Sequence, residues 1–243
     1  MKVLFIGHFS NSKSTQPGAS IAGDEVQRKI IRSLREIEAV DVLSISQIPA
    51  RTWPRGKLIL RGSKDNYSFF PWLLNIAFVR DFLFGFYCFL YLLRNKPDKL
   101  VQYNSYLFVN IFVIAASFFL RFKSIVIVQD YRVGGDFKIW SRVHDKVAGR
   151  FIRFYHVVIP VTDALAKELK VESYKCKIFP GAMEHDSPFF ESVIKKNNHN
   201  EGEIKVLYAG ALERHNGIDK LIEVWGGVPN NFKLLIYGKG SLE

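Results

Sequence analysis

The 243-residue chain is predicted to be an α/β protein built on a doubly wound parallel sheet. Short apolar runs alternate with amphipathic stretches, which is the pattern of parallel strands joined by crossover helices. The run Lys2–Gly7, KVLFIG, recurs near the end of the chain as Lys205–Gly210, KVLYAG. Each copy closes on a glycine and precedes a stretch of helical periodicity, so two similar α/β domains are predicted to begin in this chain.

The elements of the first domain can be predicted in order. After the strand Lys2–Gly7, the stretch Asp24–Ile37 repeats apolar residues at helical spacing and carries Arg and Lys on its other face, which predicts an amphipathic helix. Thr162 and Asp163 are typical helix caps, and they predict a helix from Ala164 to about Leu169. Runs rich in β-branched residues predict the further strands Val40–Ser46, Lys99–Tyr103, Ser124–Gln129 and Val157–Val161.

Two segments are apolar enough to be considered as membrane spans. Phe69–Leu93 is rich in aromatic residues, but Arg80 and Asp81 interrupt it, and charges are costly in lipid. Leu107–Leu120 is shorter than the roughly 20 residues that a spanning helix needs. A buried helix between strands is the prediction for the second segment.

The domain boundary is predicted in the polar stretch Lys195–Gly202, which lacks periodicity. The chain would then comprise residues 1–196 as an N-terminal domain and residues 203–243 as the first β/α/β of a second one. Hydrophobic residues make up 48% of the chain, enough for a substantial core. Cys88 and Cys176 are too few for a disulfide framework or a metal cluster and are predicted to be reduced and buried, which fits a cytosolic protein.

Four segments resemble those of one enzyme family, and they occur in the same order. Val157–Leu165 resembles the family's strand and Ser/Thr-capped helix, and Lys177–Glu184 is similar to the strand and turn that follow. Val206–Leu212 followed by Gly217–Ile222 resembles the start of a nucleotide-binding domain, and Leu234–Gly240 its next strand and turn. The ordered set resembles the retaining glycosyltransferases of family 4, which have the GT-B architecture of two facing Rossmann-like domains.

The resemblance implies a metal-independent, cofactor-free transferase that moves a sugar from a nucleotide-sugar donor to a lipid-linked or polysaccharide acceptor. The chain has no Asp-x-Asp motif, in agreement with a mechanism that needs no metal. Asp130, together with Gln129, is the candidate for acceptor contact or proton transfer; a turn-forming aspartate is the alternative. The candidates for donor binding are Gly23, Gly210, Arg214, Gly217 and Gly238.

Gly23 also has a physical argument in its favour. A glycine at a helix N-terminus lets a phosphate approach the backbone N–H groups, although a glycine needed only for the turn is the alternative. Arg214 or His215 could supply a cation for the diphosphate, or either could be a solvated loop residue.

The chain departs from the family in several places. Ala211 and Asn216 stand where the family has an arginine and a lysine for the diphosphate, and Gln129 stands where it has a histidine. The paired glutamates that hold ribose and donor sugar do not occur before Glu243. We therefore expect either a fragment or a truncated, inactive transferase. A non-catalytic GT-B-like partner protein is the alternative function, and a nucleotide-sugar epimerase is a third.

The charge balance predicts an anionic partner. The net charge is +11 and the isoelectric point near 9.6. Lys138, Arg142, Lys146 and Arg150 recur every four residues, which predicts a basic amphipathic helix that contacts an anionic membrane or lines the groove for a lipid-pyrophosphate acceptor. A plain solvated face is the alternative. The sequence has no helix-turn-helix, zinc-finger or RNP-like pattern, so nucleic acid is not the expected partner. The reduced cysteines and the basic helix together predict a cytoplasmic protein, peripheral at the inner face of the membrane.

Overall fold

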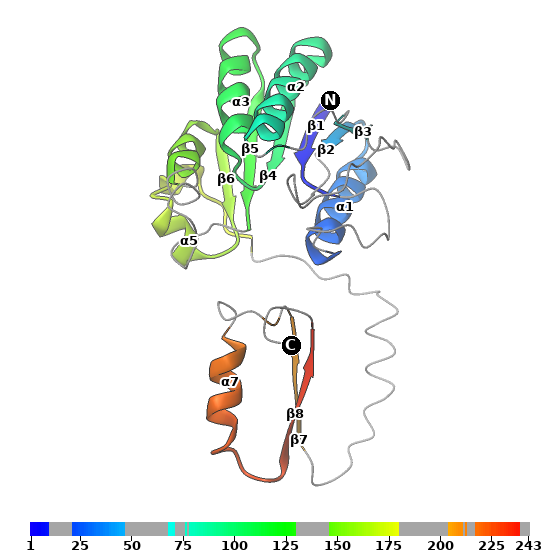
Figure 1. Cartoon of the computed structure of the whole chain (residues 1–243). Coiled ribbons are helices and arrows are strands. Elements are labelled where there is room, and N and C mark those ends of the chain that lie inside the picture. The colour runs from blue at the N-terminus through cyan, green and yellow to red at the C-terminus, as the bar shows by residue number, and fades with distance from the viewer. Residues whose placement is uncertain are drawn as a thin grey trace. The chain divides into compact units, whose positions relative to one another are not determined.

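The computed structural model describes residues 1–9, 21–46, 68–70, 76, 78–129, 146–179, 204–210, 212 and 217–238. The chain divides into two compact units, Met1–Ala182 and Met183–Glu243, and each is described by itself (Figure 1). We refer to them as the N-terminal and the C-terminal unit.

A parallel sheet forms the centre of the N-terminal unit. Its strand order is β3-β2-β1-β4-β5-β6, and every pairing is parallel. Successive strands are thus added on one side of β1 and then, from β4 onward, on the other. This is the predicted doubly wound α/β class. The strands are β1 Lys2–Gly7, β2 Asp41–Ser46, β3 Ser68–Phe69, β4 Lys99–Tyr103, β5 Lys123–Val128 and β6 Val157–Pro160.

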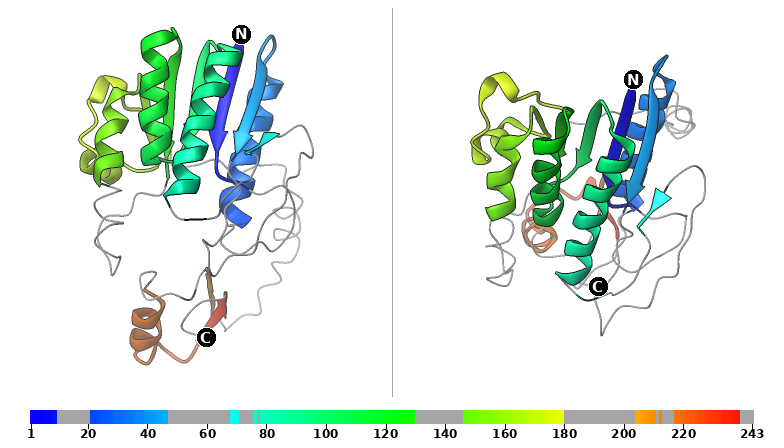
Figure 2. Two further views of the ribbon diagram at one scale, coloured as in Figure 1. Left: turned by 45° about the horizontal axis from the view of Figure 1, so that its top comes forward. Right: turned by 90° about the horizontal axis from the view of Figure 1, so that it is seen from above.

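Helices cover both faces of this sheet. Helix α1, Ile21–Glu36, packs on one face, and α2, Val79–Asn95, and α3, Leu107–Phe119, pack on the other (Figure 2). Helix α1 begins three residues earlier than the predicted Asp24 and already includes Gly23. The smaller helices are α5, Asp163–Glu168, and the 3₁₀ turns η1, Ile152–Phe154, and η2, Ser173–Lys175. Thr162 caps α5 as predicted, since its hydroxyl accepts a hydrogen bond from the Leu165 amide at 3.1 Å.

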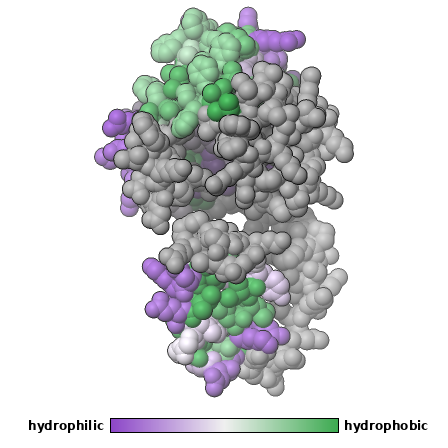
Figure 3. All heavy atoms as spheres, viewed as in Figure 1, coloured by the Kyte–Doolittle hydropathy of each residue, from purple (hydrophilic) through white to green (hydrophobic). Residues whose placement is uncertain are grey.

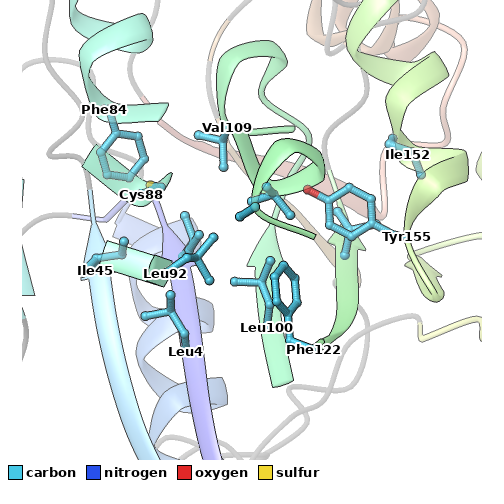
Figure 4. Packing of buried hydrophobic residues seen from close by; sticks show 14 of the residues in the cluster. Leu4, Ile45, Phe84, Cys88, Leu92, Leu100, Val109, Phe122, Ile152 and Tyr155 are labelled. Carbon is cyan, nitrogen blue, oxygen red and sulfur yellow. The ribbon is translucent and has the colours of Figure 1, made fainter. Parts of the chain in front are cut away.

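Alternate residues of each strand belong to two separate cores. Leu4 and Ile6 of β1 pack on the side of α2 and α3, where Figure 4 shows Leu4 next to Leu92 of α2. Val3 and Phe5, which alternate with Leu4 and Ile6 along β1, pack with Ile31 of α1 on the other face. This division follows from the two-residue period of a strand. Because β1 lies between two apolar cores, it is apolar on both faces from Val3 to Ile6, as its sequence is.

The two cysteines differ in their surroundings. Both are free thiols, and Cys88 is buried in the core under α2, as predicted. Burial raises the pKa of the Cys88 thiol well above its ordinary value and keeps it neutral. The prediction of burial was wrong for Cys176, which is half-buried because it lies beside β6, the edge strand among the residues that the structure describes.

Helices α2 and α3 approach each other closely at Gly85. A Cβ atom on this glycine would lie 2.8 Å from both the carbonyl carbon and the carbonyl oxygen of Phe108, so no side chain fits. Helix α3 was predicted to be buried, which is correct only for the face that carries Val109, Val113 and Ala116. Of the helices that the structure describes, none combines the length and the apolar character required to cross a bilayer.

The described part of the C-terminal unit is small. Strands β7, Ile204–Ala209, and β8, Phe232–Tyr237, pair in parallel, and α7, Ile218–Trp225, connects them. Ile218 is buried, whereas Leu207 of β7 and Ile222 of α7 are exposed.

Candidate functional site

The carboxyl ends of β1 and β4 define the candidate site of the N-terminal unit. The sheet winds in opposite directions on the two sides of this pair, so the loops that leave the two strands diverge. In open parallel sheets, ligands bind in the crevice that such divergence creates. The residues directly after β1, β4 and β5 are therefore the first to consider.

A glutamine joins the end of β1 to the start of α1. The buried Gln27 accepts a hydrogen bond from the His8 amide at 2.9 Å and donates to the His8 carbonyl, also at 2.9 Å. Its amide nitrogen lies 3.1 Å from the carbonyl oxygen of Gly23. A Cβ on Gly7 would lie 2.5 Å from the Gln27 oxygen, so glycine at this position lets the glutamine come so close. Gly23 is the third residue of α1, and the Gln27 side chain links its carbonyl to His8 at the end of β1.

His8 is a candidate site residue that the sequence patterns did not single out. Its imidazole stacks on Tyr106, with ring centroids 3.6 Å apart, and meets the edge of Phe84 at 5.2 Å. These three side chains line a cavity of about 20 Å³, enough for one water molecule. The sequence feature that could have indicated His8 is its position as a polar aromatic residue immediately after the first strand. The structure adds that the strand order reverses at this position.

The ends of β4 and β5 are tied together by side chains. Asn104 adopts a left-handed backbone conformation with φ 59°, and its side-chain oxygen accepts a hydrogen bond from the Gln129 amide at 2.9 Å. The Tyr103 hydroxyl donates to the side-chain oxygen of Gln129. The predicted site residue Gln129 is thus at this edge, with its side chain held by β4. Asp130 lies outside the described residues.

A buried polar network lies beneath this edge. Asn110 of α3 accepts hydrogen bonds from the Gln102 amide at 2.8 Å and from the Tyr155 hydroxyl at 3.0 Å. It donates to Ser105 at 2.8 Å and to the carbonyl of Ala148 at 3.2 Å. Burial, and secondarily the nearby Cys88, raises the pKa of Tyr155 well above its ordinary value, so the phenol stays protonated and can donate. The network fixes the loop after β4, which carries Asn104 and Tyr106.

Replacing Asn110 with leucine is expected to destabilise the N-terminal unit by about 2–3 kcal/mol, because the buried groups that it bonds lose a partner. Urea unfolding followed by circular dichroism would measure the loss. The control is Ser117→Ala on the same helix, whose exposed hydroxyl donates to the Ile114 carbonyl within its own helix; it should change stability by less than about 0.5 kcal/mol. Equal stability of the two variants would contradict a structural role for the network.

The predicted donor-binding glycines of the C-terminal unit lie around the ends of its strands. Gly210 follows β7, and its amide donates to the Tyr237 carbonyl at 3.0 Å. A Cβ on Gly238, which follows β8, would lie only 1.8 Å from the carbonyl oxygen of Gly210. Gly217 precedes α7 with φ 73°, a left-handed conformation that favours glycine, and has open space where a Cβ would be. Arg214 lies outside the described residues.

The predicted basic helix is described only in its second half. Residues 146–151 are helical, with Lys146 and Arg150 exposed and Ala148 buried. Lys138 and Arg142 lie outside the described residues. Among the residues that the structure describes, no group of three His, Cys, Asp or Glu side chains is placed to hold a metal ion.

Comparison with known proteins gives structural matches only. No known protein family and no curated sequence matches the chain. A sucrose-phosphate synthase from Thermosynechococcus elongatus superposes with a TM-score of 0.64 at 14% identity, over 98% of this chain and 62% of the synthase. A lipopolysaccharide outer core galactosyltransferase, WaaB, gives 0.60 at 13% identity, over 99% of this chain and 62% of that enzyme. A UDP-GlcNAc 2-epimerase from Neisseria meningitidis, solved with UDP-GlcNAc, gives 0.56 at 12% identity, over 97% and 65%.

These matches extend over nearly all of this chain, and the chain spans less than two thirds of each matched protein. At such identities the likeness shows the fold. The chain therefore has the α/β, Rossmann-like architecture of the GT-B glycosyltransferases.

Proposed function

We propose that the protein is a glycosyltransferase that moves a sugar from a nucleotide-sugar donor to a lipid-linked or polysaccharide acceptor. The observation that carries the proposal is the order of elements in the C-terminal unit. Strand β7 is followed by Gly210, and Gly217, in a left-handed conformation, precedes α7, which is the order expected of a nucleotide-binding domain. The fold shared with a galactosyltransferase and a sucrose-phosphate synthase supports it. The reaction retains the anomeric configuration and needs no metal.

In this proposal the two units have different tasks. Departure of the nucleoside diphosphate leaves negative charge on its phosphates, and backbone N–H groups after Gly210, Gly217 and Gly238 stabilise that charge. Gly23, in the first turn of α1, lets the donor approach the N-terminal unit. Arg214 adds a cation. Asp130 and Gln129 position the acceptor hydroxyl, and the Asp130 carboxylate accepts the proton that this hydroxyl loses.

The acceptor is proposed to come from a membrane. Lys138, Arg142, Lys146 and Arg150 attract an anionic lipid surface or the pyrophosphate of a lipid-linked acceptor. The proposed enzyme is cytoplasmic, peripheral at the inner face of the membrane, and acts in the synthesis of cell-surface polysaccharide or glycolipid.

Replacing Asp130 with asparagine is expected to lower sugar transfer by roughly 10²- to 10⁴-fold without changing the melting temperature, because a general base is lost while size and polarity are kept. The measurement is transfer of radiolabelled sugar from a panel of nucleotide sugars to membrane extract. The matched control is Asp163→Asn, at an exposed position in the first turn of α5, which should transfer as the wild type does. Unchanged transfer by the Asp130 variant would remove this residue from the mechanism.

An epimerase is the second candidate, favoured by the structural likeness to a UDP-GlcNAc 2-epimerase. The same assay separates the two functions. A transferase consumes nucleotide sugar only when acceptor is present, whereas an epimerase converts it to another nucleotide sugar without membrane extract. A protein that does neither, but that binds a glycosyltransferase, would be a non-catalytic partner protein.

A further inference from the structure

An apolar surface extends over the outer side of α2 and α3. Four large side chains recur every fourth residue from the start of α2, and each is at least two fifths exposed: Phe78, Phe82, Phe86 and Leu90. At the end of α3, Phe118 is 82% and Phe119 is 74% exposed. We call these six residues the phenylalanine face, and Figure 3 shows apolar side chains gathered over this part of the molecule.

Ring contacts make the phenylalanine face continuous across the two helices. The Phe112 ring of α3 lies 5.4 Å from that of Phe82 and 5.7 Å from that of Phe86, centroid to centroid. Phe89 in turn lies 6.5 Å from Phe119. A contiguous apolar surface of this kind is uncommon on a protein that meets only water, and it marks a contact surface.

Cations surround the end of the phenylalanine face where both helices terminate. Arg94 and Lys96 lie at the C-terminal end of α2, and Arg121 and Lys123 follow α3; all four are exposed. Next to Phe118, a groove of about 720 Å³ is lined by Lys99, Arg121, Lys123 and His156. Asp98 also lines this groove, and its carboxylate accepts a hydrogen bond from the Lys2 amide at 2.6 Å.

We propose that the phenylalanine face is a membrane-contact surface that inserts its rings into the interfacial region of an anionic phospholipid bilayer. The cations around it then meet lipid phosphates, and the groove beside Phe118 accepts a headgroup. A bilayer satisfies both features at once, since it offers apolar chains beneath a negative surface. The charge complementarity between these cations and lipid phosphates is the reason why we propose a bilayer, and a second copy of this chain is an outcome that the test below distinguishes. The proposal concerns a surface distinct from the Lys138–Arg150 stripe and does not depend on sugar transfer.

Vesicle sedimentation of the full chain tests the apolar part of the proposal. Binding to phosphatidylcholine vesicles that contain about 30% phosphatidylglycerol is expected for the wild type. The double variant Phe118→Ser/Phe119→Ser should lower the partition coefficient by roughly 10- to 100-fold, since two inserted rings are lost. Both rings are largely exposed, so folding is preserved. The matched control is Ile37→Ser, an exposed apolar residue just after α1 on the opposite side of the sheet, which should bind as the wild type does.

Charge reversal tests the electrostatic part. Arg121→Glu/Lys123→Glu should lower binding to the anionic vesicles by more than about tenfold and leave binding to pure phosphatidylcholine unchanged. The control Arg32→Glu/Lys167→Glu removes the same net charge from exposed positions on α1 and α5 and should have a much smaller effect. Equal loss in both charge variants would show that net charge, and not this surface, directs binding.

The proposal is overturned if the serine variant binds vesicles as the wild type does, or if the wild type does not bind them. It is also overturned if analytical ultracentrifugation shows a wild-type dimer that the serine variant converts to a monomer in the absence of lipid, because a second copy then covers the phenylalanine face. The assay contains no nucleotide sugar. Failure of the proposed transferase activity would therefore leave these results unaffected, and failure of membrane binding would leave the transferase assay unaffected.

Discussion

Replacing Gly85 with valine is expected to destabilise the N-terminal unit by about 3 kcal/mol or more. The new Cβ would lie 2.8 Å from the backbone carbonyl of Phe108 and 2.9 Å from the Phe112 ring, so α2 and α3 must separate. Valine and glycine have similar, low helix propensities, and local preference does not offset the clash. Separation would loosen the core beneath α2, which includes Phe84 and Cys88.

Hydrogen exchange of the amides in β1 and β4 would measure this loss within the N-terminal unit alone. The control is Gly226→Val, at a glycine with helical φ −60° and nothing within 4 Å of its Cβ position. It should leave the protection of β1 and β4 unchanged. If Gly85→Val exchanged as slowly as the wild type, the two helices could not be in contact at this glycine.

Replacing Gly238 with alanine is expected to open the carboxyl end of the β7–β8 pair. The Cβ would lie 1.8 Å from the carbonyl oxygen of Gly210, a backbone atom that can move only with its strand. The hydrogen bond from the Gly210 amide to Tyr237 would be lost, and exchange at that amide should accelerate by tenfold or more, equivalent to about 1.4 kcal/mol. Under the proposed function, nucleotide binding would weaken as well, since both glycines line the donor site.

The control for this variant is Gly227→Ala, whose Cβ would meet the Val224 carbonyl oxygen at an ordinary distance of 3.7 Å. Its effect on exchange at Gly210 should be negligible. Calorimetry with UDP and GDP would report whether nucleotide affinity changes together with strand protection. Unaltered exchange in Gly238→Ala would show that the strand ends are not as close as described.

Local sequence signals predicted the elements of the sheet but not every boundary. The β-branched runs identified β5 and β6 to within one residue, and the Thr162 cap predicted the start of α5 to within one residue, since the helix begins at Asp163 and not at Ala164. Helix α1 began earlier than expected because its periodic apolar residues start only at Val26. Its first turn, with Gly23, is joined to β1 through Gln27, a long-range contact that periodicity does not reveal.

The candidate site was predicted only in part. Gln129 was identified at the end of its strand, but its partners Tyr103 and Asn104 come from a strand 25 residues or more away, and the register of β4 against β5 brings them together. His8 was not identified, because its importance depends on where the sheet order reverses. Strand order is a property of the assembled sheet.

By itself the sequence determined the α/β class and the alternation of strands and helices, since these depend on periodicity and capping over a few neighbouring residues. The tertiary structure alone decided which apolar residues remain outside. Phe118 and Phe119 are as apolar as Val113 and Ala116, yet they are exposed while the latter two are buried. One side of α3 faces the sheet and α2, and the other side has no layer above it among the residues described, so hydropathy cannot distinguish the two.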